Sequence, residues 1–148
     1  MNSDDVEIGV RGLMPVSSGV AAFLGTAAKV FVIHVDSSTG KAMHMAMQGR
    51  SHPRPMTHDL VTQLLMGFDI RLERVLIDKR EEDTFFAKLF LCKTLPDGGR
   101  EVLVLDARPS DCIVLAIQAR RPVYITRDVL EGVEDMSDLL ERFRSEDK

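Results

Sequence analysis

Alternating apolar and polar residues at the start of the chain predict a β-strand with one buried face. Val6, Ile8 and Val10 are separated by single, less apolar residues, which is the two-residue period of a half-buried strand. Apolar runs at 20–24 and 30–33 each follow a cluster of turn-forming residues. We therefore expect three sequential strands that form an antiparallel meander.

A first helix is predicted directly after this meander. Residues 36–40 are rich in the side chains that favour helix N-caps, and Gly49 offers a stop. The helix should therefore run from about residue 40 to residue 48. Met43 and Met47 lie four residues apart on one face, a pattern more typical of core packing than of a binding surface.

A second helix is expected after the proline-containing loop at 50–55. Thr57 is a suitable N-cap, and the helix should end near Gly67. Leu60, Leu64 and Leu65 would supply its apolar face.

Strand signals return in the second half of the chain. Residues 70–77 begin as an alternation, and residues 85–91 form an apolar return run. Residues 96–99, Pro-Asp-Gly-Gly, are a strong hairpin signal because glycine adopts positive φ at low cost. Residues 102–105 would then pair back as a third sequential strand.

The last part of the chain predicts a buried helix, a short strand and a helical tail. The helix around residues 113–117 is apolar on most sides and should end at residues 120–122. Residues 123–126 suit a short strand. Helical spacing continues in the tail at Val133, Met136, Leu139, Leu140 and Phe143.

These elements predict one compact α+β domain with a largely antiparallel or mixed sheet and three to four helices. We place the domain at residues 6–130 and a C-terminal helical tail at 131–148. The sequence contains no internal repeat, low-complexity segment or linker.

Composition narrows the class of protein. The chain has 148 residues, of which 45% are hydrophobic, and 23 acidic against 19 basic residues give a net charge of -4. This charge argues against a broadly basic, nonspecific nucleic-acid binder, although a local basic patch remains compatible with it. The two cysteines, a polar N-terminus and the interrupted apolar region at 19–35 predict a soluble protein of a reducing cytoplasm with no membrane partner.

Polar side chains are concentrated where the strand at 102–105 gives way to a helix. Pro109 suits a first helical turn, Ser110 or Asp111 could cap that turn, and Asp106 could pair with Arg108. A helix N-terminus with a nearby arginine is also a phosphate-binding arrangement. The residues alone favour neither interpretation.

A second polar cluster opens the helix expected after residue 57. Arg54, Thr57, His58 and Asp59 stand within six residues, and His58 is the group able to move protons near neutral pH. Neighbouring residues on a helix point in different directions, so Asp59 could serve a partner other than His58. Taken alone, such a cluster is more often a helix start than a site.

Other chemistries have weaker support. Asp59, Asp106 and Asp111 with His58 would suit Mg²⁺ or Mn²⁺ better than zinc, but no His-x-x-x-His spacing is present. The glycine patterns of serine hydrolases and of nucleotide-binding loops are absent. Cys92 on a strand and Cys112 at a helix start are interpreted as core thiols, although the position of Cys112 could also lower its pKa.

Three segments together resemble the bifunctional nuclease domain family. They are Arg-Pro-Met-Thr-His-Asp-Leu at 54–60, Thr-Phe-Phe-Ala at 84–87 and Asp-Ala-Arg-Pro-Ser-Asp at 106–111. The resemblance covers roughly residues 6–130. It implies a compact α+β domain, a homodimer or higher homo-oligomer in a bacterial cytoplasm, and cleavage of RNA and DNA.

Site roles follow from this resemblance as hypotheses. The catalytic candidates are His58, Asp59, Asp106 and Asp111. The candidates for binding a nucleic-acid substrate are Arg54, Thr57, Arg108 and Ser110. Mg²⁺ or Mn²⁺ would be the cofactor if the carboxylates hold a metal ion.

One position departs from the family pattern and supports an alternative. Thr39 stands where the resemblance leads us to expect a glutamate, and Asp36 or His34 could compensate. The alternative function is a non-catalytic, oligomeric binding or regulatory module whose polar clusters are structural. The acidic net charge, the lack of a clear metal set and the missing glutamate favour it.

Overall fold

The computed structural model describes residues 2–146 and begins with the expected meander. β1 (Val6–Val16), β2 (Gly19–Gly25) and β3 (Val30–Val35) pair in sequence and antiparallel. Gly19 opens β2 at φ +148°, where a side chain would collide with the Val35 carbonyl. Only glycine fits this close approach without strain.

Apart from a short helix at 127–132 that was not predicted, the remaining elements follow the predicted order. They are α1 (Ser37–Met47), α2 (Thr57–Gly67), β4 (Ile70–Glu81), β5 (Thr84–Thr94), β6 (Arg100–Ala107), α3 (Pro109–Ala119), β7 (Val123–Ile125), α4 (Arg127–Gly132) and α5 (Ser137–Glu146). The predicted hairpin joins β5 to β6, and Gly98 adopts a φ of +87° there. No helix among residues 2–146 is long and apolar enough to cross a membrane.

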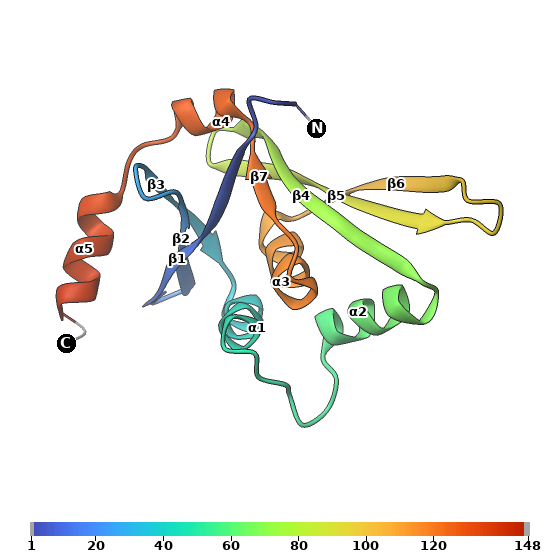
Figure 1. Ribbon diagram of the computed structural model, residues 1–148. Helices are drawn as coiled ribbons and strands as arrows, with labels where there is room; N and C mark the ends of the chain where they lie inside the picture. The colour runs from blue at the N-terminus through green and yellow to red at the C-terminus, as the bar shows by residue number, and fades with distance from the viewer. Residues whose placement is uncertain (1, 147–148) are drawn as a thin grey trace.

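All seven strands form one mixed sheet in the order β3-β2-β1-β7-β4-β5-β6. Every pairing is antiparallel except that between β4 and β7. β7 therefore joins the N-terminal meander to the strands of the second half (Figure 1). The structure confirms the predicted α+β class and the single domain, although residues 2–146 form five helices where three to four were expected.

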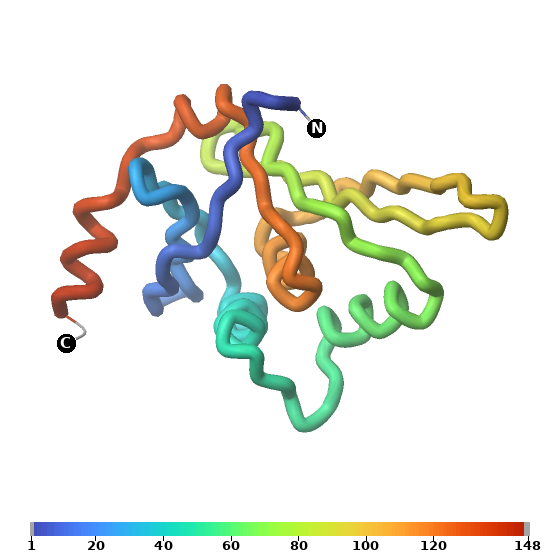
Figure 2. Tube along the Cα trace, viewed as in Figure 1, coloured from blue at the N-terminus to red at the C-terminus, as the bar shows by residue number. Residues whose placement is uncertain are grey.

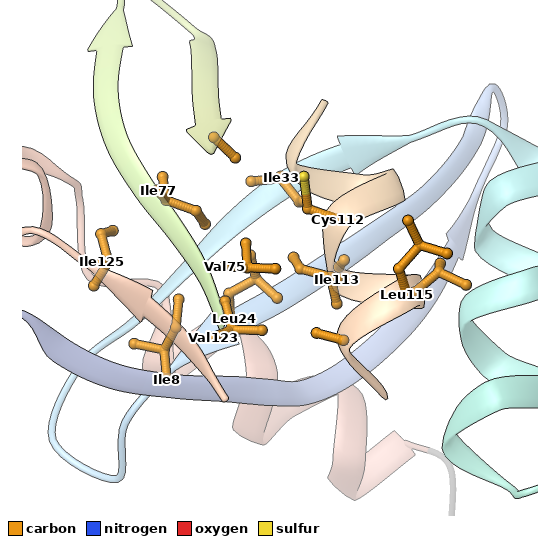
Figure 3. Packing of buried hydrophobic residues seen from close by; sticks show 14 of the residues in the cluster. Ile8, Leu24, Ile33, Val75, Ile77, Cys112, Ile113, Leu115, Val123 and Ile125 are labelled. Atoms are coloured by element: carbon orange, nitrogen blue, oxygen red, sulfur yellow. The ribbon is translucent and has the colours of Figure 1, made fainter. Parts of the chain in front are cut away.

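α3 is the central helix of the core. Figure 3 shows Ile113 of this helix among side chains of the sheet, with Leu24 and Val75 nearby. These three residues are at most 1% exposed, and Cys112 is fully buried. Burial of this order stabilises a fold by about 1.5–3 kcal/mol for each large aliphatic side chain. The all-round apolar character of α3 is thus explained by its central position.

Two helix starts differ from the predictions. α1 begins at Ser37, earlier than expected, because Asp36 is its N-cap and accepts a hydrogen bond from the Thr39 N–H. The predicted N-cap of α2 was wrong: Met56 takes that position, and the Asp59 carboxylate accepts from the Met56 N–H. A carboxylate three residues into the helix thus serves the helix start instead of a Thr57 hydroxyl.

The predicted apolar faces of α1 and α2 also need correction. Met43 is fully buried, but Met47 is 43% exposed. Leu65 packs against the core as expected, whereas Leu60 and Leu64 are more than half exposed. The helical period alone does not say which side of an apolar helix meets the protein.

α5 packs against the outer surface of the meander. Leu140 of this helix forms a second small core with Phe23 and Val30, and the rings of Phe23 and Phe143 stack at 6.4 Å. Figure 2 shows this last helix alongside the meander, far from the β5–β6 hairpin. The predicted helical spacing holds from Leu139 to Phe143, while Val133 and Met136 precede the helix.

Candidate functional site at three helix N-termini

The N-terminal ends of α2 and α3 meet through one hydrogen bond. His58 Nε2 and Asp111 Oδ1 lie 2.8 Å apart. A carboxylate accepts but does not donate, so Nε2 carries the proton and Nδ1 of the neutral ring is left as an acceptor. The two polar clusters identified in the sequence therefore form one site.

Arg108 links the same carboxylate to α1. Its Nε and Nη2 donate to the two oxygens of Asp111 at 2.8 and 3.2 Å. Its Nη1 donates to Asp36 Oδ1 at 3.4 Å, and its Nη2 donates to the Thr39 hydroxyl at 3.4 Å. Three helix N-termini, each with the positive end of a helix dipole, thus converge on the Arg108–Asp111 pair.

Asp111 is held ionised by its neighbours. Burial by itself raises the pKa of this carboxyl, but hydrogen bonds from Arg108 and His58 outweigh it and leave the pKa below its ordinary value. The side chains of His58, Asp111 and Arg108 are 14%, 30% and 62% exposed. The pair between His58 and Asp111 therefore lies under a more exposed guanidinium.

Asp36 is the carboxylate that Arg108 meets on the side of α1, next to Thr39. Thr39 is buried and offers Arg108 only a hydroxyl. The pKa of Asp36 is lowered by hydrogen bonds from Thr39 and by the charge of Arg108. His34, the other residue considered for this role, instead lies 3.4 Å from the Ser18 hydroxyl.

Asp59 belongs to a separate network at the start of α2. His52 Nδ1 donates to its Oδ2 at 3.2 Å, and Gln118 Nε2 donates to its Oδ1 at 3.0 Å. Hydrogen bonding from the Met56 N–H and then from His52 lowers the pKa of Asp59. The structure thus gives Asp59 a partner other than His58, as the helix geometry suggested. The sequence contains no spacing signal for His52.

Asp106 lies apart from the Arg108–Asp111 pair. Its carboxylate is 72% exposed and stands 3.5 Å from Lys88 Nζ. The expected local pair between Asp106 and Arg108 is therefore not formed. Lys88 is the residue opposite Asp106 on β5, so the register of the hairpin decides this contact.

A cavity of about 630 Å³ opens beside Arg108, a size typical of ligand sites. Its walls come from β3, the β4–β5 turn, the start of α3 and the segment after α4. Polar groups that line it include Asp36, Asp83, Thr84, Arg108 and Ser110. Two of the three family-like segments therefore contribute to one cavity, whereas His58 lies outside its lining.

The other predicted binding residues differ in accessibility. Ser110 is 7% exposed. Arg54 and Thr57 are exposed, and Arg54 makes no ion pair with any residue from 2 to 146. The guanidinium of Arg54, in the loop before α2, therefore has no carboxylate partner among the described residues.

The residues do not fit a metal centre. Within residues 2–146, no three His, Cys, Asp or Glu side chains are grouped to hold a metal ion. The carboxylates proposed as ligands are engaged separately: Asp59 by His52, Asp106 by Lys88 and Asp111 by Arg108.

Cys112 is not an activated thiol. Burial, followed by the charges of Asp111 and Asp106, raises the pKa of Cys112 to about 12. The interpretation of Cys92 and Cys112 as core thiols is confirmed, and the alternative of a lowered pKa for Cys112 is wrong. Loss of hydration outweighs the helix dipole here.

Comparison with known proteins identifies a family and several relatives that are similar to this chain. Residues 24–137 match the family described as the bifunctional nuclease domain. An uncharacterized protein of Mycobacterium tuberculosis is 32% identical over 98 residues, which cover 66% of this chain and 55% of the relative. Bifunctional nuclease 1 of Arabidopsis thaliana is 33% identical over 84 residues, which cover 55% of this chain and 25% of the relative.

A rice relative extends the comparison. Bifunctional nuclease 2 of Oryza sativa subsp. japonica is 32% identical over 78 residues, covering 51% of this chain and 23% of the relative. The matched part of the chain thus spans about half the length of the mycobacterial relative and about a quarter of the plant relatives.

Proposed function

The chain belongs to the bifunctional nuclease domain family, and we propose that it cleaves phosphodiester bonds of RNA and DNA where α1, α2 and α3 meet. The observation that carries this proposal is the 2.8 Å contact between His58 and Asp111. A histidine oriented by an ionised carboxylate is a recurrent general base.

His58 is the proton acceptor in this proposal. Because Nε2–H donates to Asp111, Nδ1 is free to take a proton from the attacking hydroxyl group or water. Asp111 fixes this tautomer and stabilises the charged ring once it is protonated. Arg108 acts one step further back, since its double contact holds Asp111 in place.

Phosphate binding is assigned to Arg54 and to the helix ends. Arg54 is exposed and has no carboxylate partner among the described residues, so its guanidinium can pair with a phosphate. The converging N-termini of α1, α2 and α3 add positive potential. Arg108 has less to offer a phosphate because Asp36, Thr39 and Asp111 engage most of its N–H groups.

No step of this proposal passes through a metal ion, because the grouped donors that a metal needs do not occur among residues 2–146. Mg²⁺ and Mn²⁺ still belong in the assay. Stimulation of cleavage by either ion would then be visible and would show that substrate phosphates complete a site.

The test is cleavage of single-stranded RNA and DNA by protein freed of contaminating nuclease. We expect activity in the wild type, strong loss in His58→Gln and Asp111→Asn, and retention in Asp106→Asn. The last variant is a matched control because it removes a nearby aspartate that pairs with Lys88 instead. If the wild type cleaves neither RNA nor DNA, whether Mg²⁺ or Mn²⁺ is present or absent, the proposal that the protein is a nuclease is refuted.

A second candidate is a non-catalytic binding or regulatory module. The observation that favours it is that the polar groups of the site already bond to one another. Asp111 accepts one hydrogen bond from His58 and two from Arg108, and Arg108 also donates to Asp36 at the start of α1. Such a network would fasten three helices together without any chemistry. In this case, the same substitutions would lower stability strongly in a protein that cleaves neither nucleic acid.

We also propose a cytoplasmic location. Cys92 and Cys112 are both free and buried, which fits a reducing compartment.

A further inference from the structure

β3 is an edge strand of the sheet. It pairs only with β2, so it lies at the opposite edge from β6 (Figure 1). In antiparallel strands, successive residues direct their backbone N–H and C=O groups to opposite sides. Every second residue of β3 therefore directs both of these groups away from β2.

The contacts of Val30 show which residues of β3 point outward. Its N–H donates to Asp135 Oδ1 at 3.1 Å, and its carbonyl accepts from the Met136 N–H at 2.6 Å. Both partners come from the segment after α4, so these groups of Val30 face away from β2. Because the strand repeats every two residues, Val32 and His34 face the same way. Within residues 2–146, no hydrogen bond satisfies their backbone groups on this side.

This unpaired edge lies in the cavity at the start of α3. Every residue from Phe31 to Asp36 lines that cavity, and the β4–β5 turn and the start of α3 form other walls. The rings of Phe31 and Phe85 pack with their centroids 5.4 Å apart, so β3 and β5 are in contact there. The cavity volume of about 630 Å³ is typical of ligand sites. The open edge of β3 is therefore accessible from a built cavity.

Carboxylates outnumber arginines among the charged residues of the cavity. Asp36, Asp83 and Glu134 line it together with Arg80 and Arg108. Asp36 pairs with Arg108, and Arg80 donates to a backbone carbonyl. Asp83 and Glu134 are exposed, and neither forms an ion pair with another of residues 2–146. The cavity therefore offers two unpaired carboxylates to a positively charged group.

Ser110 adds a polar group to the same cavity. It is only 7% exposed and lines the cavity. Its hydroxyl has no hydrogen-bond partner among residues 2–146, and a buried polar group without a partner costs free energy. A hydroxyl both donates and accepts, so a ligand with backbone amides can satisfy it.

We propose that an extended, positively charged peptide segment of another protein binds in this cavity as an additional strand on β3. Its backbone pairs with the N–H and C=O groups of Val32 and His34, and a lysine or arginine side chain meets Asp83 and Glu134. Ser110 bonds to the peptide backbone from the α3 side. Strand addition to a sheet edge is a common mode of peptide recognition.

The same features disfavour a nucleic acid in this cavity. A phosphodiester group accepts hydrogen bonds but does not donate them, so it leaves the carbonyls of Val32 and His34 unsatisfied. The free carboxylates of Asp83 and Glu134 would also repel it. Peptide binding at β3 does not depend on whether His58 belongs to a nuclease, and its test involves no cleavage.

The primary test is an NMR titration of the isotope-labelled full chain with acetyl-Thr-Val-Lys-Val-Thr-Val-amide. This peptide has the usual strand length of about six residues. We expect the amide signals of Val32 and His34 to shift and their exchange with solvent to slow, because both N–H groups become hydrogen-bonded. The same peptide with every amide N-methylated cannot donate and should cause neither effect.

The charge requirement is tested with two matched double variants. Asp83→Asn/Glu134→Gln should weaken binding of the lysine peptide by roughly three- to tenfold, as expected for the loss of exposed ion pairs. Glu82→Gln/Glu131→Gln removes the same charge from residues outside the cavity lining and should leave the affinity unchanged. Equal affinities of the two double variants would overturn the assignment of a cationic peptide.

Val32→Pro gives a second reading of strand addition. It removes an N–H that does not bond to β2, and edge strands tolerate proline at such positions. We expect this variant to keep its circular dichroism spectrum and to lose the peptide. A folded Val32→Pro protein that binds as tightly as the wild type would overturn the proposal.

Three further outcomes of the titration would overturn it as well. One is that the lysine peptide leaves the signals of Val32 and His34 unchanged. Another is that a single-stranded oligonucleotide shifts these signals and the peptide does not, which would assign the cavity to nucleic acid. The third is slowed exchange of both amides as the protein alone is concentrated, which would assign the edge to a second copy.

Discussion

His58 and Asp111 lie 53 positions apart in the chain, and their side chains meet at 2.8 Å. One residue comes from the first turn of α2 and the other from the first turn of α3. Asp111 is held from its other side by Arg108, which also reaches α1. Substitutions of Asp111 can therefore test the effect of this contact on cleavage, on stability and on the pH dependence of stability.

The first prediction concerns catalysis. His58→Gln should reduce cleavage of RNA and DNA by roughly 10²–10⁴-fold, because a positioned general base typically contributes that much. Asp111→Asn should also reduce the cleavage rate. Arg108 would orient the new amide so that it no longer fixes the tautomer of His58. Initial rates measured on both substrates, with Asp106→Asn as the matched control, check this expectation.

The second prediction concerns stability. Asp111→Ala should lower the free energy of unfolding by about 2 kcal/mol, because hydrogen bonds to charged groups contribute about 1.5–3 kcal/mol. Arg54→Ala should change it by less than about 0.5 kcal/mol, as expected for an exposed residue without a partner. Urea unfolding followed by circular dichroism compares the two variants. Equal stabilities would contradict the structural role of Asp111.

The third prediction is a dependence of stability on acid pH. The pKa values of Asp36, Asp59 and Asp111 lie below the ordinary value of 3.8 in the folded protein. The unfolded chain then binds more protons in this range, so stability rises with pH there. The contribution is complete above the unfolded value and is lost as the pH falls through the folded values.

Asp111→Asn provides the control for this pH dependence. It should unfold with a shallower loss of stability below about pH 4, because one of the carboxyls with a lowered pKa is gone. Urea midpoints at a series of pH values measure the slope. An unchanged slope would mean that the pairs around Asp111 do not persist in solution.

The fourth prediction asks whether Asp36 replaces the missing acid. Thr39→Glu should destabilise the protein by about 1 kcal/mol or more, because it adds volume at a buried position and a charge beside Asp36. The same substitution should cost less in an Asp36→Ser background, where the new carboxylate can pair with Arg108. Serine keeps the N-cap function, so the double-mutant cycle isolates the charge.

The decisive outcome of that cycle is whether the effects of Thr39→Glu and Asp36→Ser on the free energy of unfolding are non-additive. If both backgrounds respond equally to Thr39→Glu, Asp36 does not take the role of an acid at position 39.

Several elements could be predicted because their signals are local. The alternation at Val6–Val10 and the glycines of the β5–β6 turn depend only on neighbouring residues, and both predictions are confirmed. Pro109 also occupies the first turn of α3 as expected. The predicted N-cap at Thr57 failed because the carboxylate of Asp59, two residues later, accepts a hydrogen bond from the Met56 N–H and satisfies the helix start from within.

The candidate site was less predictable because its partners are remote. The sequence pointed to Arg108, Asp111 and His58, but it offered Asp106 as a possible partner of Arg108 and named no partner for Asp59. His52 and Asp36 fill the missing positions only once the loop before α2 and the end of β3 are folded against the helices.

By itself, the sequence determined the order of strands and helices, the α+β class and the family, since these depend on periodicity and on short segments. The tertiary structure decided which carboxylate meets which cation, that Asp36 stands beside Arg108, and that Leu60 and Leu64 face outward. The physical reason is that a hydrogen bond depends on distances of about 3 Å. Only the packing of α1, α2 and α3 against one another brings such side chains that close.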